Sequence, residues 1–459
     1  MDVVTLARIQ FGGTIAFHYI YPPLSIGLGV MLVIIEGLWL KTQNPIYHQI
    51  ARFWTRVFAL TFAIGVATGI VMEFEFGTNW ATYSRFVGDV FGSALAAEGI
   101  FAFFLESGFL AVLLFGWDKV GRKFHFFSTC MVCLGAHFSA VWIVVANSWM
   151  QTPAGYHIVG QGMHARAEVT DFWQMIFNPS TLERLMHTIC GAWCAGAFLV
   201  VSVSAYYLLK GLHLEFARKS IKLGLLVALI VSLLQGATGH ISGQGIAKNQ
   251  PAKLAAFEGL YNTTSNAPLN LVGFVDEKNE RVIGISLPYA LSFMAHNDIH
   301  APVTGLNEFK QEDWPPVAPC FLFFHGMVGA GMAMIAVAML GLWYLRRNSL
   351  TERRWLLWIL VFSVLLPEIA NQLGWFAAEV GRQPWIVYGV MRTPEGLSKV
   401  VQANVVFTSL ILFTIIYFLL FMVFIYLLND KIKHGPHEDD LIPSGKLALP
   451  DELNEHKKP

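Results

Sequence analysis

The fold is decided by stretches such as residues 185–209, LMHTICGAWCAGAFLVVSVSAYYLL, which contain no aspartate, glutamate, lysine or arginine. About 20 mainly apolar residues are enough for an α-helix to cross the hydrocarbon core of a bilayer. Eight further mainly apolar stretches occur, some with one or two charged residues, at residues 14–40, 54–73, 94–116, 125–149, 221–240, 321–345, 355–378 and 403–428. The sequence therefore predicts an all-α integral membrane protein with nine transmembrane helices.

The composition of the 459-residue chain agrees with a membrane protein. Apolar residues make up 55% of the chain and charged residues only 14%, whereas about 25% of a soluble domain is charged. The 31 basic residues equal the 31 acidic residues, so the net charge gives no sign of a polyanionic partner. These values exclude a disordered chain, a nucleic-acid-binding protein and an ordinary cytosolic enzyme.

The basic residues predict the orientation in the membrane. Fourteen of them lie in four short connections, every second one along the chain, which therefore share one side of the membrane. They are Lys41, Arg52, Arg56, Lys119, Arg122, Lys123, Lys210, Arg218, Lys219, Lys222, Arg346, Arg347, Arg353 and Arg354. Because lysine and arginine are enriched in cytoplasmic loops, we expect these connections in the cytoplasm. With nine spans, the N-terminus is then periplasmic and the C-terminus cytoplasmic.

The spans divide the chain into four parts. Residues 1–240 hold the first six helices, 241–320 form a periplasmic loop, 321–428 hold the last three helices, and 429–459 form a cytoplasmic polar tail. The loop contains an amphipathic piece, Lys253–Glu258. A connection of this length, about 80 residues, far exceeds the usual few residues and is often functional. A solvated loop without a function is the alternative.

Five side chains that can bind iron lie on five different spans, all predicted near the periplasmic surface. They are His18, Glu98, His187, Met327 and Glu379. A histidine and a methionine together form the low-spin cytochrome ligand pair. Taken singly, each residue has a simpler explanation: helix–helix hydrogen bonding for the histidines, core packing for Met327, and pairing with Arg382 for Glu379. Their shared depth favours a buried redox cofactor, whose acidic groups Arg382 could neutralise.

A second acidic residue follows Glu98 on the third span. In an α-helix, Glu106 would lie roughly 12 Å deeper than Glu98 and about 80° around the axis. Ser107 lies beside Glu106, and Ser139 is on the next helix. A buried carboxylate below a redox centre is expected to relay protons. The alternative is a neutral carboxylic acid that is hydrogen-bonded between helices.

The sequence resembles subunit I of the cytochrome bd-type quinol oxidases over nearly its whole length. The stretches that carry this resemblance are Gly65–Trp80 (GVATGIVMEFEFGTNW), Glu98–Ser107 (EGIFAFFLES), Ala146–Gln151 (ANSWMQ), Lys253–Glu258 (KLAAFE) and Gly374–Trp385 (GWFAAEVGRQPW). Gly65 and Gly69 also form a GxxxG pattern, which is typical of close helix packing or of close approach to a flat cofactor.

The resemblance implies three haems, a bacterial inner-membrane location and a second membrane subunit, and it leaves open a further small single-span subunit. His187 and Met327 would be the axial ligands of a low-spin haem b. A high-spin haem b and a haem d, or a further haem b in its place, would use His18, Glu98 and Glu379, in an order left open. Trp375 and Arg382 would contact a cofactor.

The resemblance also implies where quinol and protons are handled. Lys253 and Glu258 match the quinol-oxidising loop, which here resembles the short version because no inserted block follows it. Glu106, Ser107 and Ser139 match positions on the proton path of the family. The implied reaction is the oxidation of ubiquinol or menaquinol coupled to the reduction of dioxygen to water. It would generate a proton motive force by charge separation, without pumping.

The chain departs from the family pattern at two places. His325 stands where the family often has an arginine near the methionine ligand, and could neutralise a haem propionate only when protonated. Gln372 and Leu373 precede Gly374, where glutamate and alanine are common. Short-loop relatives include cyanide-insensitive oxidases that carry haem b in place of haem d. The identity of the third haem therefore stays open.

Two other classes of protein compete with this interpretation. A haem–copper oxidase needs several clustered histidines, and no span contains adjacent histidines. A proton-coupled transporter could use Glu98 and Glu106, but such transporters usually consist of two related halves, and nine spans without an internal repeat do not fit that pattern.

Overall fold

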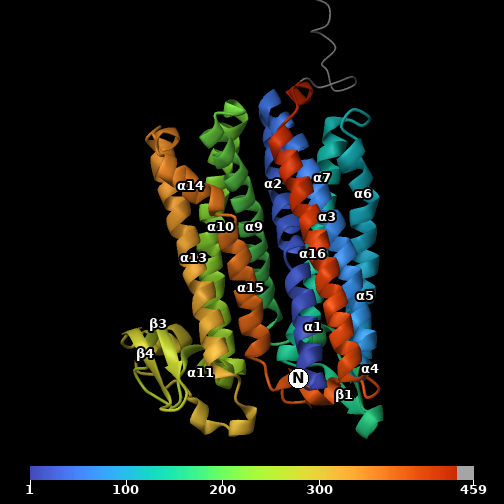
Figure 1. The fold of residues 1–459 in the computed structure, drawn as a ribbon, viewed down its shortest axis with the longest axis vertical. Helices are drawn as coiled ribbons and strands as arrows, with labels where there is room; N and C mark the ends of the chain where they lie inside the picture. The colour runs from blue at the N-terminus through green and yellow to red at the C-terminus, as the bar shows by residue number, and fades with distance from the viewer. Residues whose placement is uncertain (442–459) are drawn as a thin grey trace, which may run out of the picture.

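Long helices packed side by side form most of the computed structural model, which describes residues 1–441 (Figure 1). The long helices are α1 (Val3–His18), α2 (Tyr21–Thr42), α3 (Pro45–Thr78), α5 (Gly88–Ala97), α6 (Phe104–Phe115), α7 (Arg122–Gln151), α9 (Thr181–Lys210), α10 (Leu214–Asn249), α13 (Val317–Arg346), α14 (Arg354–Phe362), α15 (Leu365–Val380) and α16 (Ala403–His434). Within residues 1–441 they make up nine apolar segments long enough to cross a membrane, as predicted.

The connections contain further short helices and three small two-stranded sheets, which the prediction of an all-α chain did not include. The short helices are α4 (Ala81–Phe86), α8 (Phe172–Ile176), α11 (Pro251–Glu258) and α12 (Ala290–His296). The strands are β1 (Tyr156–Val159), β2 (Arg166–Val169), β3 (Leu269–Asp276), β4 (Arg281–Leu287), β5 (Trp385–Val387) and β6 (Met391–Arg392). Each sheet is one antiparallel pair, β1 with β2, β3 with β4, and β5 with β6.

Three of the nine segments are not continuous α-helices. The first is interrupted between α1 and α2, where Pro22 and Pro23 cannot donate to the carbonyls of His18 and Tyr19. The eighth is interrupted between α14 and α15, because Pro367 cannot donate to the carbonyl of Ser363. The third contains a π-helical turn, Glu98–Phe103, of the kind that is frequent at functional sites.

Helix α9 lies at the centre of the largest apolar core and packs against α2, α10 and α14. Its crossing with α2 is a contact between backbones. A Cβ atom placed on Gly196 would lie 2.1 Å from the carbonyl carbon of Gly27. Glycine is therefore required at this crossing, because any side chain would push the two helices apart.

We expect Gly196→Ala to destabilise the folded protein by about 1–3 kcal/mol or more, the usual cost of overpacking a core. The matched control is Gly108→Ala in α6, because no atom lies within 4 Å of a Cβ placed there. Thermal unfolding of the purified protein measures both variants. Equal melting temperatures for the two would contradict the close crossing of α2 and α9.

The connection predicted as a loop at 241–320 begins later and is largely structured. Helix α10 continues to Asn249, α11 follows directly, and strands β3 and β4 form a hairpin before α12. The predicted amphipathic piece coincides with the end of α11, whose residues are nearly all buried. Figure 1 shows α11 and the hairpin at the same end of the molecule as the N-terminus. The basic connections lie at the opposite end.

The last membrane span packs beside the first one. Helix α16 packs beside α1 and α3, and the ring of Tyr417 stacks on Phe17 with their centroids 4.6 Å apart. Ser409 donates a hydrogen bond of 3.1 Å to the side-chain oxygen of Gln10. Polar and aromatic contacts thus complete the surroundings of α1 with residues from the ninth span.

The predicted polar tail at 429–459 begins too early. Helix α16 continues to His434, and the segment after it folds back onto α3. The buried carboxylate of Asp440 lies 3.0 Å from Arg52 Nε and 2.9 Å from Arg56 Nη2. Residues up to 441 are therefore part of the packed bundle, and the remainder of the predicted tail lies outside the described residues.

Candidate functional site

One connected cavity of about 1560 Å³ reaches from the middle of the bundle to α11. Every residue predicted from the sequence to form the site lines it, with the exception of Ser107. These residues are His18, Glu98, Glu106, Ser139, His187, Lys253, Glu258, Met327, Trp375, Glu379 and Arg382. They come from spans that are far apart in the sequence, so the fold gathers them around a single space.

His18 occupies the last position of α1, directly before the interruption of the first span. Its Nδ1 lies 2.9 Å from Thr68 Oγ1, which fixes the orientation of the ring. A Cβ atom placed on Gly69 would lie 3.2 Å from His18 Cε1. The GxxxG pattern is thus explained by close packing of α3 against the end of α1 and the start of α2, where Gly65 approaches Tyr21.

His187 and Met327 line the same cavity from α9 and α13, and each lies against a glycine. His187 Nδ1 is 3.2 Å from Thr238 Oγ1, and a Cβ atom on Gly239 would lie 3.3 Å from its ring. Likewise, a Cβ atom on Gly374 would lie 2.8 Å from Met327 Sδ. Because these two glycines carry no side chain, helices α10 and α15 can pack directly against the two predicted ligands.

The acidic residues of the third span are arranged differently from the prediction. Ser139 donates a 2.6 Å hydrogen bond to Glu98, whereas Glu106 packs against Gly135. Ser107 is exposed, and its hydroxyl donates 2.7 Å to the carbonyl of Phe103, outside the cavity. The π-helical turn between the two glutamates widens the helix, so the 80° offset calculated for an α-helix does not apply.

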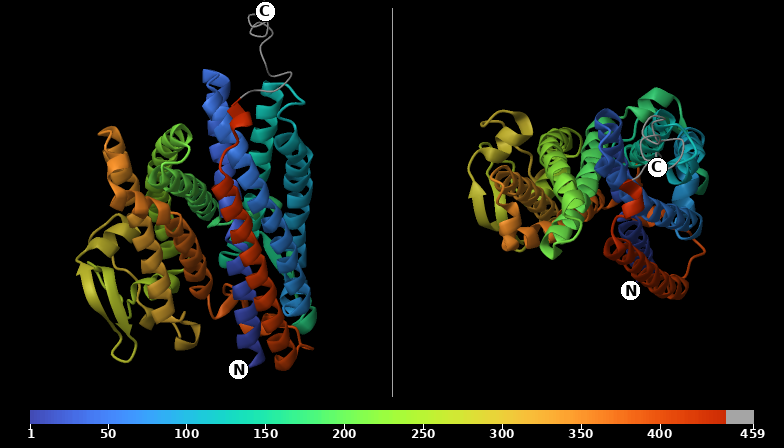
Figure 2. Two further views of the ribbon diagram at one scale, coloured as in Figure 1. Left: turned by 45° about the horizontal axis from the view of Figure 1, so that its top comes forward. Right: turned by 90° about the horizontal axis from the view of Figure 1, so that it is seen from above.

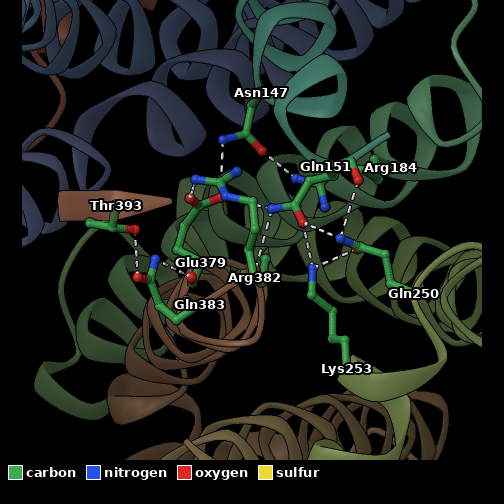
Figure 3. A network of polar contacts seen from close by, with 10 residues as sticks. Asn147, Gln151, Arg184, Gln250, Lys253, Glu379, Arg382, Gln383 and Thr393 are labelled. Atoms are coloured by element: carbon green, nitrogen blue, oxygen red, sulfur yellow. Dashed lines mark hydrogen bonds and ion pairs between the residues drawn. The ribbon is translucent and has the colours of Figure 1, made fainter. Parts of the chain in front are cut away.

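A polar network connects Glu379 with Lys253 (Figure 3). Glu379 accepts hydrogen bonds from Arg382, from Asn147 at 3.0 Å and from Gln151 at 3.3 Å. The Gln151 side-chain oxygen accepts in turn from Lys253 Nζ at 2.5 Å. Gln151 thus bridges the two predicted residues through opposite ends of its amide.

This network contains more positive than negative charge. Arg184, Lys253 and Arg382 surround the single carboxylate of Glu379, and Arg184 also donates to Asn147. Burial lowers the pKa of Lys253 well below its usual value, and the two arginines lower it further. Arg382 is only 4% exposed, and within residues 1–441 its Nε and Nη1 have no hydrogen-bond partner. Buried donors of this kind need an anionic or polar partner.

Glu258 lies at the end of α11 beside the β3–β4 hairpin. Its side chain is buried, and burial raises its pKa to about 8. Asn270 of β3 donates a 2.8 Å hydrogen bond to the backbone carbonyl of Glu258. Within the described chain, Glu258 Oε2 has no hydrogen-bond partner. A carboxylic acid whose pKa lies close to physiological pH can both release and accept a proton there.

His325 takes a different position from the one its sequence context suggested. Its Nε2 lies 2.7 Å from the carbonyl of Asn270 and 3.9 Å from Glu258 Oε2, and its ring stacks on Phe321. It is not among the residues that line the cavity. The ring therefore faces the hairpin and not the cavity.

Sequence reasoning did not identify two of the residues that organise the site, Arg184 and Gln151. Arg184 precedes His187 by about one helical turn, so the two side chains are expected on the same face of α9. This spacing could have identified Arg184 as a residue of the site. Gln151 is the last residue of the stretch Ala146–Gln151, but nothing in the sequence indicated that it bridges Glu379 and Lys253.

Comparisons with known proteins cover nearly the whole chain. The family model of cytochrome bd terminal oxidase subunit I matches residues 6–436. The chain is 40% identical to cytochrome bd ubiquinol oxidase subunit 1 of Bacillus subtilis (strain 168), over 96% of either chain. It is 32% identical to cytochrome bd-II ubiquinol oxidase subunit 1 of Escherichia coli (strain K12), over 95% of this chain and 97% of that one. The structure of bd oxidase from Geobacillus thermodenitrificans superposes with a TM-score of 0.89 at 34% identity, covering 95% of this chain and 99% of that one.

Proposed function

This chain belongs to the cytochrome bd terminal oxidase subunit I family, and we propose that it oxidises a membrane quinol and passes the electrons to dioxygen, which is reduced to water. Members of this family are oxidoreductases of electron transport, and the chain is a multi-pass protein of the bacterial inner membrane. The proposal depends on one observation above all. The predicted cofactor residues and the predicted quinol residues line the same cavity.

The residues around the cavity fit haem. Within residues 1–441 no three histidine, cysteine, aspartate or glutamate side chains are grouped to hold a free metal ion. Haem iron needs only one or two protein ligands, because the porphyrin supplies the others. We propose His187 and Met327 as the ligands of a low-spin haem b. A high-spin haem b and a haem d, or a further haem b, would use His18, Glu98 and Glu379.

The glycines and the arginine support this assignment. Gly239 and Gly374 allow α10 and α15 to pack directly against His187 and Met327, which holds both side chains in place. The two unpartnered nitrogens of Arg382 are suited to a propionate group, and Trp375 lines the same cavity. When bound, the haems would supply one-electron transfer and, at an iron with an open position, oxygen chemistry.

We propose that quinol is oxidised beside α11. Glu258 would accept a proton from the quinol hydroxyl in its ionised form. Its pKa of about 8 makes this carboxylate a stronger base than an ordinary glutamate. Lys253 would orient a quinol oxygen. When protonated, its ammonium group has three donors, and two are used by Gln151 and Gln250. One donor is then left to point at a substrate.

Protons for water would come from the cytoplasm along the third span. The hydrogen bond from Ser139 to Glu98 supports a route in which Glu106 passes protons to Glu98. Ser107 stays on the proposed route by the family pattern alone. If quinol protons leave on the periplasmic side, charge is separated across the membrane without a pump. A second membrane subunit, as the family name implies, would complete the oxidase, and a small single-span subunit is compatible with it.

The test of this proposal is a visible absorption spectrum of the purified complex, followed by pyridine haemochrome analysis. We expect three haems per complex, with b-type haem present and with d-type haem identified or replaced by b. A complex without haem bands would contradict the oxidase and favour a transporter. Copper in metal analysis would instead favour a haem–copper enzyme.

We expect Arg382→Gln to lower the haem content of the purified complex, because the substitution removes the buried positive charge proposed to hold a propionate. The loss should be of the order of 10- to 100-fold in haem affinity, the range found for residues that support a metal centre. Arg166→Ala is the control, because the Arg166 side chain is 63% exposed. Unchanged haem content in both variants would contradict the assignment of Arg382.

A further inference from the structure

The β3–β4 hairpin exposes one strongly apolar face. Val272 pairs with Ile285, and Phe274 pairs with Ile283, so the four side chains lie on the same face of the two strands. Their exposed fractions are 67%, 69%, 81% and 55%, respectively. The opposite face carries Val275 and Val282, which pack near Gly259 at the end of α11. The hairpin therefore has one side against the protein and one apolar side without a protein neighbour in the described chain.

This face is unusual for a hairpin in water. A two-stranded hairpin is marginally stable by itself, and contiguous exposed apolar patches mark interaction sites. Phe293 of the neighbouring α12 is 50% exposed, and Tyr289, which directly precedes that helix, is 51% exposed. The charged residues of this region are concentrated in the turn between the strands, residues 276–281. The patch is thus apolar along the strands and polar only at the tip.

The position of the hairpin indicates what covers the patch. Figures 1 and 2 show it on the perimeter of the bundle, beside the end of α13 that lies away from the basic connections. Strand β3 contacts α13, and Asn270 approaches His325 of that helix. Helix α13 itself exposes Leu322 at 66% and Met332 at 62%, as expected for a helix that faces lipid. The hairpin with its exposed apolar face therefore lies beside a membrane span that also exposes apolar side chains.

We propose that the outer face of the β3–β4 hairpin lies in the interfacial layer of the bilayer, in contact with phospholipid glycerol groups and upper acyl chains. Apolar side chains buried in this layer contribute free energy in proportion to their area. The inner face of the same hairpin supports Glu258 through Asn270. Lipid contact would hold this support in place, although the contact itself does not rest on the proposed quinol oxidation.

The experiment uses the complete oxidase complex, reconstituted in lipid nanodiscs that contain a phosphatidylcholine with a diazirine close to its glycerol group. After illumination, mass spectrometry locates the lipid adducts. We expect adducts on residues 269–287 and also on the exposed side of α13, which serves as the internal positive control. The double variant Phe274→Ser/Ile285→Ser should lose the hairpin adducts several-fold and keep those on α13. Lys278→Ala, in the polar turn, should keep both.

Three results would overturn the proposal. Adducts on α13 with none on the hairpin would mean that the face lies in water. Adducts on neither element would mean that protein covers both. Cross-links from the hairpin to another subunit or to a second copy, formed by a protein cross-linker, would identify a protein partner in place of lipid. If the double variant does not fold, the distribution of adducts on the unmodified protein still decides between these outcomes.

Discussion

Replacing His187 with alanine is expected to remove the low-spin haem bands from the spectrum and to abolish quinol-driven oxygen uptake. The ring lies beside Gly239 in the common cavity, contacts Thr238 and Gln235, and is replaced in the variant by a methyl group that cannot bind iron. Quinol electrons would then have no first acceptor. Reduced-minus-oxidised difference spectra and an oxygen electrode measure the two effects.

Two further variants separate loss of the ligand from loss of the fold. Thr238→Val should keep the haem but weaken its binding by about 10- to 100-fold, as expected for a residue that orients a ligand. His157→Ala should change nothing, because the His157 side chain is 53% exposed and belongs to the β1–β2 sheet. A low-spin spectrum that persists in folded His187→Ala protein would show that the ligand is misassigned.

Glu258→Gln is expected to lower quinol turnover by about 10²- to 10⁴-fold, the usual contribution of a general acid or base. The haem spectrum should be unchanged, because Glu258 lies on α11 and not among the proposed iron ligands. In the unmodified protein, turnover should rise as the pH approaches 8, since the ionised form of Glu258 accepts the proton and its pKa is about 8. In the variant, this rise should disappear.

The same raised pKa predicts the opposite trend for stability. The pKa of Glu258 is higher in the folded protein than its ordinary value of 4.5. Its contribution to stability is therefore complete below pH 4.5 and is lost as the pH rises through about 8. Glu277→Gln, in the exposed turn of the hairpin, is the matched control for both measurements. Turnover in Glu258→Gln that keeps the original pH profile would contradict a proton-accepting role.

The depth of the site residues could be predicted because a membrane fixes where a helix enters and leaves. His18, His187 and Met327 each follow from the position of an apolar segment, and the structure places all three on one cavity. Their partners could not be predicted in the same way. The rotation of a helix about its own axis decides whether Ser139 meets Glu98 or Glu106, and the π-helical turn at Glu98–Phe103 changes that rotation.

The connections were the least predictable part of the chain. A long apolar stretch identifies a membrane span. An amphipathic pattern, however, does not distinguish a loop from a helix that is packed under a hairpin. Residues 253–258 were recognised as amphipathic, yet their nearly complete burial depends on packing against α10 and α13, and Asn270 of β3 adds a hydrogen bond to Glu258. The orientation of His325 depends on the same hairpin. Long-range packing of this kind has no local signal in a single sequence.

The pairing of α16 with α1 has a consequence for how the protein is made. Ribosomes release a membrane protein from its beginning, so α1 enters the bilayer well before the ninth span exists. Until then Gln10 and Phe17 lack Ser409 and Tyr417, and the helix that ends in His18 has an open flank. If His18 binds a haem as proposed, loading of that haem would finish only after translation, when the last helix closes that flank.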